Sequence, residues 1–184
     1  NMTTIEGGAL VLNDDVEARE VEVLRFHGIT RLSDGVRDVT FPGGKFNLPD
    51  VNARMGLGQL ARLEAFNARR RELAAEYFQR FPIDPPCLLP HPGYPRDEAG
   101  HSWNLFAPLL PLDRLSIDRP QFRATLEARG IGTGIAYEAA HLTTLFRRYG
   151  HHEGELPNTE RIARETVTLP LFPAMTCDDV ERVC

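Results

Sequence analysis

A glycine-rich turn that leads into a long segment of helical periodicity is the feature that most constrains the fold of this chain. Residues 41–44 (Phe-Pro-Gly-Gly) precede Lys45-Phe46-Asn47-Leu48-Pro49-Asp50, and apolar residues then recur at helical spacing to about Phe81. Leu73, Tyr77 and Phe81 are spaced by four and therefore share one face of the predicted helix. The segment predicts one long helix whose N-terminus carries a cation, an aromatic ring and an amide.

The residues alone leave two interpretations of this helix start open. A helix N-terminus presents unpaired N–H groups and the positive end of the helix dipole, which suits a phosphate or another anion near Lys45 and Asn47. Alternatively, Asn47 is the N-cap of the helix and Pro49 lies in its first turn, where proline is tolerated. Further along, the run Arg69-Arg70-Arg71 favours a solvated face over a binding patch.

Charge and cysteine content exclude several classes of function. The chain has 21 Lys and Arg against 26 Asp and Glu, a formal net charge of −5, so any attraction to nucleic acid or anionic membranes has to be local. Cys87, Cys177 and Cys184 form an odd, widely spaced set, which argues against a disulfide framework or a zinc site. The same cysteine pattern favours a reducing cytoplasm, and no apolar run approaches the ~20 residues of a membrane span.

Strands and helices are predicted to alternate along the chain, which indicates an α/β protein. Before the glycine-rich turn, we expect a buried strand at Gly8–Leu12, a helix at Val16–Phe26 and an extended loop over residues 29–44. After the long helix, a proline cluster at Pro82–Pro95 predicts a linker. The elements expected beyond it are strands at Leu105–Leu112 and Ile131–Tyr137, helices at Arg119–Arg129, His141–Tyr149 and Thr159–Val167, an extended connector at Leu169–Pro173, and a helix that starts at Thr176.

The stretch from Gly130 to His141 is a second candidate for ligand binding. Its three alternating glycines allow close approach of the backbone to another group, and Tyr137 and His141 follow at a spacing of four. A Tyr/His pair of this kind suits a polar ligand, although a strand that ends beside an ordinary capping histidine fits equally well. The chain has no dinucleotide or P-loop glycine motif, no Gly-x-Ser-x-Gly elbow and no histidine pair at zinc-like spacing.

Short motifs follow one another along nearly the whole chain: Asn1–Gly8, Phe26–Ile29, Phe46–Asp50, Gly58–Leu60, Leu63, Asn67–Arg70, Trp103, Gly130–Gly134, His141, Leu169–Pro173 and Met175-Thr176. In this order they resemble the DegT/StrS family of pyridoxal-phosphate-dependent sugar-nucleotide aminotransferases. The segments Lys45–Asp50 and Ala139-Ala140-His141 are most similar to the branch that aminates UDP-4-keto-pentose to 4-amino-4-deoxy-L-arabinose for lipid A.

The resemblance implies a fold type I enzyme with pyridoxal 5′-phosphate as cofactor and glutamate as amino donor. Residues 1–81 would be the end of the large cofactor-binding domain and its connecting helix, and residues 82–184 the small C-terminal domain. The lysine that forms the Schiff base with the cofactor is expected immediately before Asn1. No catalytic residue is therefore expected among these 184 residues, which alone should not catalyse transamination.

The same resemblance implies a homodimer with shared active sites. Asn47 would contact the phosphate of the cofactor that the neighbouring subunit binds, and Lys45 and Phe46 would border the sugar-nucleotide pocket. Tyr137 and His141 would lie near the sugar or its diphosphate.

Two departures from the family pattern leave the substrate subgroup open: Ala136 and Asn104 each replace a histidine that is frequent in the family. Two alternatives remain: a sugar dehydratase, which keeps the fold and cofactor but replaces the lysine, and a non-catalytic half-subunit.

Overall fold

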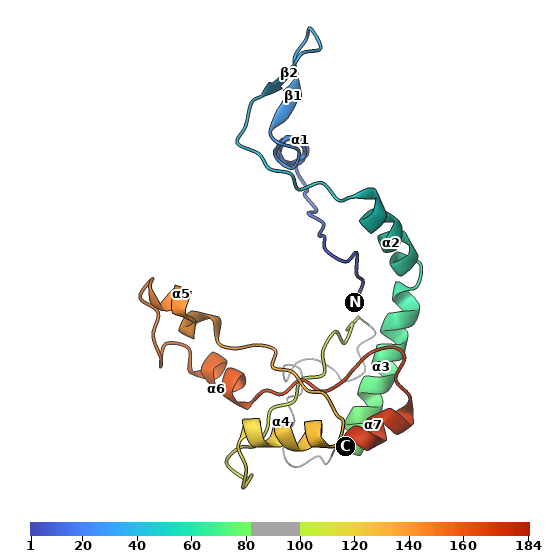
Figure 1. Ribbon diagram of the computed structural model, residues 1–184, viewed down its shortest axis with the longest axis vertical. Helices are drawn as coiled ribbons and strands as arrows, with labels where there is room; N and C mark the ends of the chain where they lie inside the picture. Colours follow the sequence, from blue (N-terminus) through green and yellow to red (C-terminus); the bar gives the residue numbers. More distant parts are fainter. Residues whose placement is uncertain (82–99) are drawn as a thin grey trace. The chain divides into compact units, whose positions relative to one another are not determined.

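The computed structural model describes residues 1–81 and 100–184, which form two compact units (Figure 1). The N-terminal unit comprises Met2–Leu63, and the C-terminal unit comprises Glu64–Cys184 together with Asn1. The domain boundary predicted after Phe81 stays a prediction, and the predicted linker at Pro82–Pro95 lies outside the described residues.

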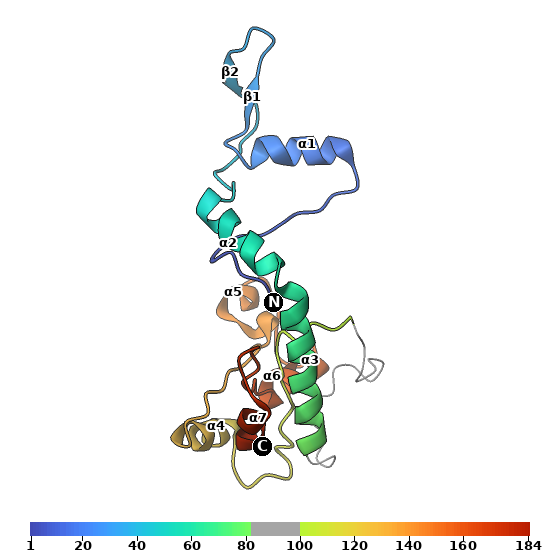
Figure 2. The same cartoon turned by 90° about the vertical axis from the view of Figure 1, so that its right-hand side faces the viewer.

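The N-terminal unit consists of two helices and a small hairpin. Helix α1 (Asp15–Leu24) is capped by Asp14, whose carboxylate accepts hydrogen bonds from the backbone of the first turn. Strands β1 (Ile29–Arg31) and β2 (Arg37–Val39) pair antiparallel and project beyond α1 (Figure 1). Figure 2 shows α1 beside the end of this hairpin, and α2 (Asp50–Leu60) follows it in the chain.

Two predictions for the N-terminal unit are wrong. The predicted loop contains the β1–β2 hairpin, because Gly35 adopts a φ of +84° and Asp34 accepts a hydrogen bond from the N–H of Val36, which closes a turn between strands too short to show a periodicity. The predicted buried strand at Gly8–Leu12 is absent, and Leu10 is 67% exposed. An apolar run indicates a buried strand only where a neighbouring strand covers it.

The predicted long helix is two helices. Helix α2 ends at Leu60, and α3 (Leu63–Arg80) begins three residues later. Gly56 and Gly58 lie in the last two turns of α2, where glycine weakens the helix by about 1 kcal/mol each relative to alanine. The break therefore falls just after the segment of lowest helix propensity.

In the C-terminal unit, the predicted starts of the helices α4 (Arg119–Ala128) and α7 (Cys177–Val183) are confirmed, and the extents of some other helices are not. Asp118 and Gln121 form a capping box at the start of α4, and Thr176 and Asp179 form another at α7. The predicted helix at His141–Tyr149 is instead a 3-10 turn followed by one short helix. The elements of the unit after α3 are α4 (Arg119–Ala128), η1 (Ala140–Leu142), α5 (Thr144–Arg147), α6 (Pro157–Glu165) and α7 (Cys177–Val183).

The predicted strands of this unit occur only as isolated antiparallel bridges. Phe106 pairs with Leu169, Leu109 with Thr166, and Gly134 with Thr168. Residues 166–169 thus pair with residues 106–109 and with Gly134. The predicted strand at Leu105–Leu112 does not form a longer ladder because Pro108 and Pro111 have no N–H group to donate.

The core of the C-terminal unit is built on one face of α3. Leu73 and Tyr77 are fully buried, as their shared face predicts. The ring of Tyr77 stacks on Phe106 with 4.4 Å between ring centroids, and its hydroxyl donates a 2.7 Å hydrogen bond to the carbonyl of Pro170. The remaining buried members of this core are Ala74, Trp103, Leu169, Leu171, Met175 and Val180.

The solvated face predicted for Arg69–Arg71 is wrong. The guanidinium of Arg70 donates to the carbonyls of Trp103, Asn104 and Leu171 at 3.1, 3.2 and 2.8 Å. Arg69 donates to the carbonyl of Met175 at 2.7 Å. These long side chains satisfy carbonyl groups of irregular segments that have few backbone partners, which a charge run in a sequence does not reveal.

We predict that Tyr77→Phe lowers the free energy of unfolding of the full chain by about 1–3 kcal/mol, because it leaves the carbonyl of Pro170 without its donor while the ring packing is kept. Urea denaturation measures this difference. Tyr149→Phe is the matched control, since that ring is exposed, and a change within about 0.5 kcal/mol is expected. Equal effects of the two substitutions would contradict the prediction.

Candidate functional site

A hollow of about 340 Å³ in the N-terminal unit brings Phe46 and Asn47 together with the Glu-Gly-Gly stretch near the start of the chain. The hydrogen bond from the Asn52 side chain to the carbonyl of Glu6, at 2.9 Å, fixes this stretch against α2. Sequence reasoning did not single out Arg25 or Asn52. The residues that line the hollow are Glu6, Gly7, Gly8, Arg25, Phe46, Asn47, Leu48 and Pro49.

The C-terminal end of α1 holds the glycine-rich turn in place. The N–H of Gly44 donates to the carbonyl of Leu24 at 2.9 Å, and the N–H of Phe46 donates to the carbonyl of Arg25 at 2.8 Å. Gly28 has a φ of +68°, and a Cβ there would lie 1.8 Å from the carbonyl oxygen of Phe41. Only glycine fits this position, so the Phe-His-Gly motif fixes where residues 45–47 emerge.

Lys45 and Phe46 leave this turn in different environments. The Lys45 ammonium lies 4.0 Å from the centre of the Phe26 ring, an attraction between the cation and the negative face of the ring. The Phe46 side chain is 77% exposed. The turn therefore presents the Lys45 ammonium, whose position is fixed by the Phe26 ring, next to the solvent-exposed ring of Phe46.

Asn47 is not the N-cap of α2, so the capping interpretation is wrong. The N-cap is Pro49, which makes no side-chain capping bond. The Oδ1 atom of Asn47 is buried and has no hydrogen-bond partner among the described residues. A buried polar atom without a partner costs roughly 1–3 kcal/mol, so this amide is suited to a ligand that completes its hydrogen bonds.

The groups around Asn47 include donors for an anion, although Glu6 in the same hollow carries a negative charge. The amide of Asn47 can turn its Nδ2 group to the place of Oδ1 by a 180° rotation, because the two orientations have the same shape. Arg25 lines the same hollow and supplies a cation. A phosphate group fits these donors, although Asp50 in the first turn of α2 already places an acid at the helix dipole.

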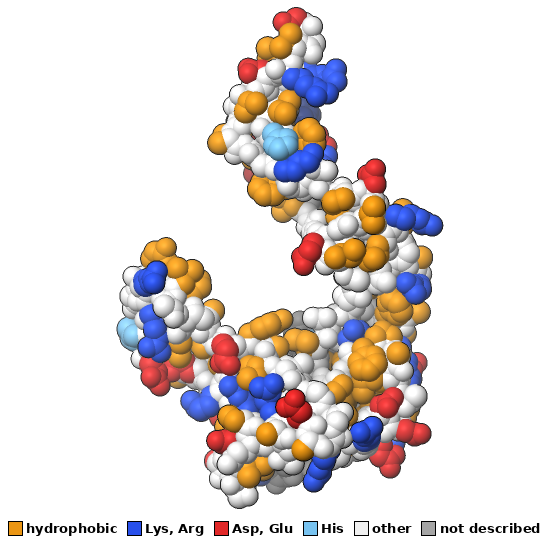
Figure 3. Space-filling view, viewed as in Figure 1, with side chains coloured by type: hydrophobic (Ala, Val, Ile, Leu, Met, Phe, Trp, Pro, Cys, Tyr) orange, Lys and Arg blue, Asp and Glu red, His pale blue; other side chains and the backbone are white. Residues whose placement is uncertain are grey.

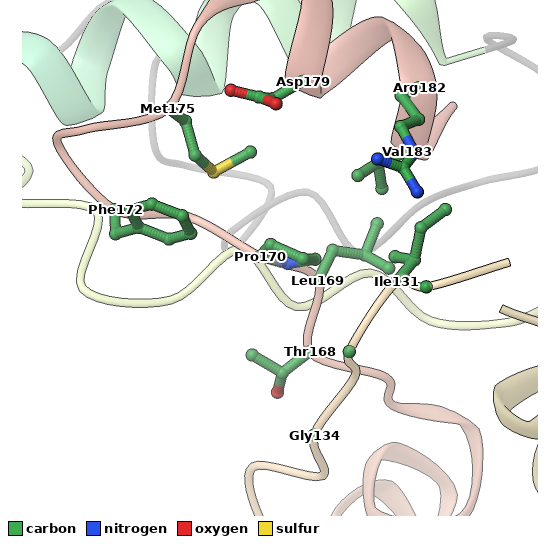
Figure 4. Close-up of a pocket in the computed structure, with 12 residues that line it drawn as sticks. Ile131, Gly134, Thr168, Leu169, Pro170, Phe172, Met175, Asp179, Arg182 and Val183 are labelled. Carbon is green, nitrogen blue, oxygen red and sulfur yellow. The ribbon is translucent and has the colours of Figure 1, made fainter. Parts of the chain in front are cut away.

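A second hollow, of about 540 Å³, lies in the C-terminal unit beside the Gly130–Gly134 stretch (Figure 4). Figure 4 shows Phe172 and Met175 on one side and Asp179, Arg182 and Val183 of α7 on another. Tyr137 and His141 do not line this hollow. The glycines and the Tyr/His pair, which the sequence suggested as one site, therefore face different surroundings.

Tyr137 and His141 also differ from each other in exposure. Tyr137 is 74% exposed, whereas His141 is 6% exposed. The Nε2 atom of His141 lies 3.1 Å from Oε1 of Glu160, and its Nδ1 atom is buried without a partner among the described residues. The same Glu160 oxygen accepts hydrogen bonds from the N–H groups of Gly154 and Leu156. His141 thus anchors the segment that joins η1 to α6.

The two groups of predicted site residues belong to different compact units. Lys45, Phe46 and Asn47 lie in the N-terminal unit, and Tyr137 and His141 lie in the C-terminal unit. Neither unit alone contains all five, and their roles stay predictions.

Two further properties hold for residues 1–81 and 100–184. No three His, Cys, Asp or Glu side chains in these ranges gather in a way that could hold a metal ion. None of the helices in these ranges combines the length and apolar character of a membrane span.

The His141–Glu160 pair predicts a dependence of stability on pH. The hydrogen bond with His141 lowers the pKa of the Glu160 carboxyl below its ordinary value of 4.5, against a smaller raising effect of partial burial. A carboxyl with a lowered pKa stabilises the folded state at pH values above its unfolded pKa, and this contribution is lost as the pH falls through the folded pKa.

We therefore expect the difference in unfolding free energy between the full chain and Glu160→Gln to be largest above pH 4.5 and to shrink in more acidic solution. Denaturation curves at a series of pH values measure it. Glu127→Gln on the exposed surface of α4 is the control, for which no such trend is expected. A difference that is constant with pH would contradict the assignment.

Comparison with known proteins places this chain in a family. The model of the DegT/DnrJ/EryC1/StrS aminotransferase family matches residues 1–184. The aminotransferase TlmJ from Streptoalloteichus hindustanus is 32% identical, with a TM-score of 0.75 over 94% of this chain and 44% of that chain. DesI, solved with its TDP-sugar product, is 26% identical, with a TM-score of 0.82 over 99% of this chain and 44% of that chain.

A third match shows how closely the fold is kept at lower identity. Helicobacter pylori PseC, an aminotransferase of pseudoaminic acid biosynthesis, is 23% identical, with a TM-score of 0.86 over 98% of this chain and 47% of that chain. This chain therefore spans just under half the length of the solved structures that it matches. The expected α/β class and fold type I architecture are confirmed.

The expected cofactor is confirmed at the level of the family, which depends on pyridoxal phosphate and has matched members in the pyridoxal-phosphate and pyridoxamine-phosphate forms. With its fold and its motifs in agreement, the chain belongs to the DegT/DnrJ/EryC1/StrS aminotransferase family.

Proposed function

We propose that the whole subunit is a cytoplasmic aminotransferase that moves an amino group from glutamate to a nucleotide-linked keto-sugar, with UDP-4-keto-pentose as the proposed substrate. The observation that carries this proposal is the buried Oδ1 atom of Asn47, which has no hydrogen-bond partner among the described residues; Asn47 lines a hollow together with Arg25. The family membership supplies the reaction class. DesI, whose structure was analysed in the presence of its TDP-sugar product, supports a nucleotide-linked sugar.

Asn47 would hold the phosphate of the cofactor that the neighbouring subunit binds, in a homodimer with shared active sites. With its amide turned so that Nδ2 takes the place of the buried Oδ1, Asn47 would donate a hydrogen bond to a phosphate oxygen, and the cost of a buried polar atom without a partner would be removed. Arg25, which lines the same hollow, adds a positive charge. This arrangement explains why the turn before α2 is fixed so closely to α1.

The other site residues of this chain would bind and orient the substrate. Lys45, held on the ring of Phe26, offers a cation to the diphosphate, and the exposed ring of Phe46 covers the sugar and excludes water. Tyr137 offers an exposed hydroxyl. His141, with Nε2 on Glu160, would act through its Nδ1 atom, which can accept a hydrogen bond from a sugar hydroxyl or a bridging water.

Bound pyridoxal phosphate supplies the electron sink for proton transfer at the substrate carbon. The lysine proposed to precede Asn1 would supply the nucleophile and carry that proton, as a desolvated lysine amine can do. The residues of this chain would contribute binding and position.

The whole subunit tests the proposal. Purified with pyridoxal phosphate, it should transfer the amino group of glutamate to UDP-4-keto-pentose and release 2-oxoglutarate. Borohydride reduction followed by peptide mapping should place the cofactor on the residue directly before Asn1. A different residue at that position, with loss of a sugar hydroxyl as the reaction, would favour the dehydratase. No cofactor uptake at all would favour the non-catalytic half-subunit.

For Asn47→Ala in the whole subunit, we predict that cofactor binding weakens by about 1.5–3 kcal/mol, the value of a hydrogen bond to a charged group. Equilibrium dialysis of pyridoxal phosphate measures this. Asn47→Asp should weaken binding at least as much, because a carboxylate repels the phosphate. Asn13→Ala, an exposed asparagine of the same unit, should leave the affinity unchanged. Unchanged affinity in Asn47→Ala would remove this residue from the cofactor site.

A further inference from the structure

The side chain of Asn1 is held by two acceptors that are distant in the sequence. Its Nδ2 group donates a hydrogen bond to Oδ1 of Asn67 at 2.9 Å, and a second one to the carbonyl of Ser102. Asn67 lies on α3, and all three residues belong to the C-terminal unit. The C-terminal unit therefore binds Asn1, although the rest of this unit begins only 63 positions later, at Glu64.

The two acceptors are themselves fixed to the core. Arg70, one turn after Asn67 on α3, donates to the carbonyls of Trp103 and Asn104, the two residues that follow Ser102. The Trp103 side chain is buried and meets Phe78 edge to face with 5.5 Å between ring centroids. The N–H of Trp103 also donates to the ring of His101 at 3.0 Å. The core thus holds both acceptors of the Asn1 amide in place, namely Oδ1 of Asn67 and the carbonyl of Ser102.

The identity of residue 67 points the same way. Asparagine is a weak helix former, since its side chain competes for backbone hydrogen bonds, and Asn67 lies in the second turn of an 18-residue helix. The contact to Asn1 gives the amide at this position a function that alanine could not serve. An acceptor oxygen is needed there because Asn1 presents its N–H group.

We propose that Asn67, together with the carbonyl of Ser102, is a positioning residue for the lysine that carries the cofactor. This inference rests on the proposed function, in which that lysine directly precedes Asn1. Adjacent Cα atoms are about 3.8 Å apart, so an anchored Asn1 restricts where the Cα of the preceding residue can lie. The two acceptors then set the direction from which the lysine side chain reaches the cofactor. Neither acceptor contacts the lysine side chain or the cofactor.

Loss of the acceptor at position 67 should change the state of the lysine–cofactor bond and should leave the affinity for the substrate unchanged. Without the acceptor at position 67, the Asn1 backbone is freer and the lysine nitrogen is less well aligned with the cofactor ring. We expect the pH at which the visible band of the bound cofactor changes colour to shift, and the cofactor to dissociate several-fold faster. The kcat should fall about 10-fold, as expected for a displacement of catalytic groups, with KM for the sugar nucleotide nearly unchanged.

The experiment compares three variants of the whole subunit loaded with pyridoxal phosphate. Asn67→Ala removes the acceptor, Asn67→Asp keeps an oxygen that accepts from Asn1, and Asn158→Ala removes an exposed asparagine from another helix, α6. The readouts are the pH titration of the visible band, the rate of cofactor loss to a scavenger, kcat and KM, and the melting temperature of the cofactor-free protein. The alanine variant should show the shifts, the aspartate variant should recover most of the wild-type behaviour, and the α6 control should match wild type.

Two results would overturn the inference. One is an alanine variant with a wild-type titration and rate of cofactor loss. The other is an equal loss in Asn67→Ala and Asn67→Asp that follows a lowered melting temperature of the cofactor-free protein, which would give Asn67 a structural role alone. Should Asn67→Ala not fold, Asn1→Asp tests the same contact from the other side, because it places a carboxylate against two acceptors. Failure of the proposed function is distinct, since wild type itself would then show no cofactor band.

Discussion

Donation of hydrogen bonds from the side chains of α3 to distant carbonyl groups is the interaction on which the C-terminal unit depends. The unit has isolated bridges instead of a sheet, so its irregular segments lack regular backbone partners. Arg70 supplies donors to residues 103, 104 and 171, and Tyr77 supplies one to Pro170. Because these donors come from one rigid helix, they fix the position of segments about 30 to 100 residues away. The apolar core of Leu73 and Phe106 then closes around them.

The N-terminal unit is held in a different way. Within Met2–Leu63 only Gly28 and Gly56 are buried, and large apolar side chains are exposed over much of the surface seen in Figure 3. Backbone hydrogen bonds between the end of α1 and the glycine-rich turn therefore determine its local geometry. An apolar surface of this kind is typical of an interface, and a shared active site in a homodimer would give it a covering. In that proposal, Asn47 belongs to the interface and to the cofactor site at once.

The residues proposed to bind ligands are of unequal kinds in both units. In the N-terminal unit, the glycine-rich turn fixes the backbone just before Asn47, Arg25 lines the same hollow, and Phe46 is exposed. In the C-terminal unit, Tyr137 is exposed. His141 is buried and tied to Glu160, so its contribution depends on the one ring nitrogen that the fold leaves without a described partner. Asn67 adds a link from α3 to the residue beside the proposed lysine.

The sequence by itself determined the local features and the family. The caps of α1, α4 and α7 and the buried face of α3 depend on residues within a few positions of one another. The family resemblance depends on short motifs and on their order along the chain. The tertiary structure alone decided the β1–β2 hairpin, the carbonyl contacts of Arg70, and the pairs His141–Glu160 and Asn1–Asn67. These features join residues from 6 to 101 positions apart, and local periodicity contains no information about which distant group a polar side chain will meet.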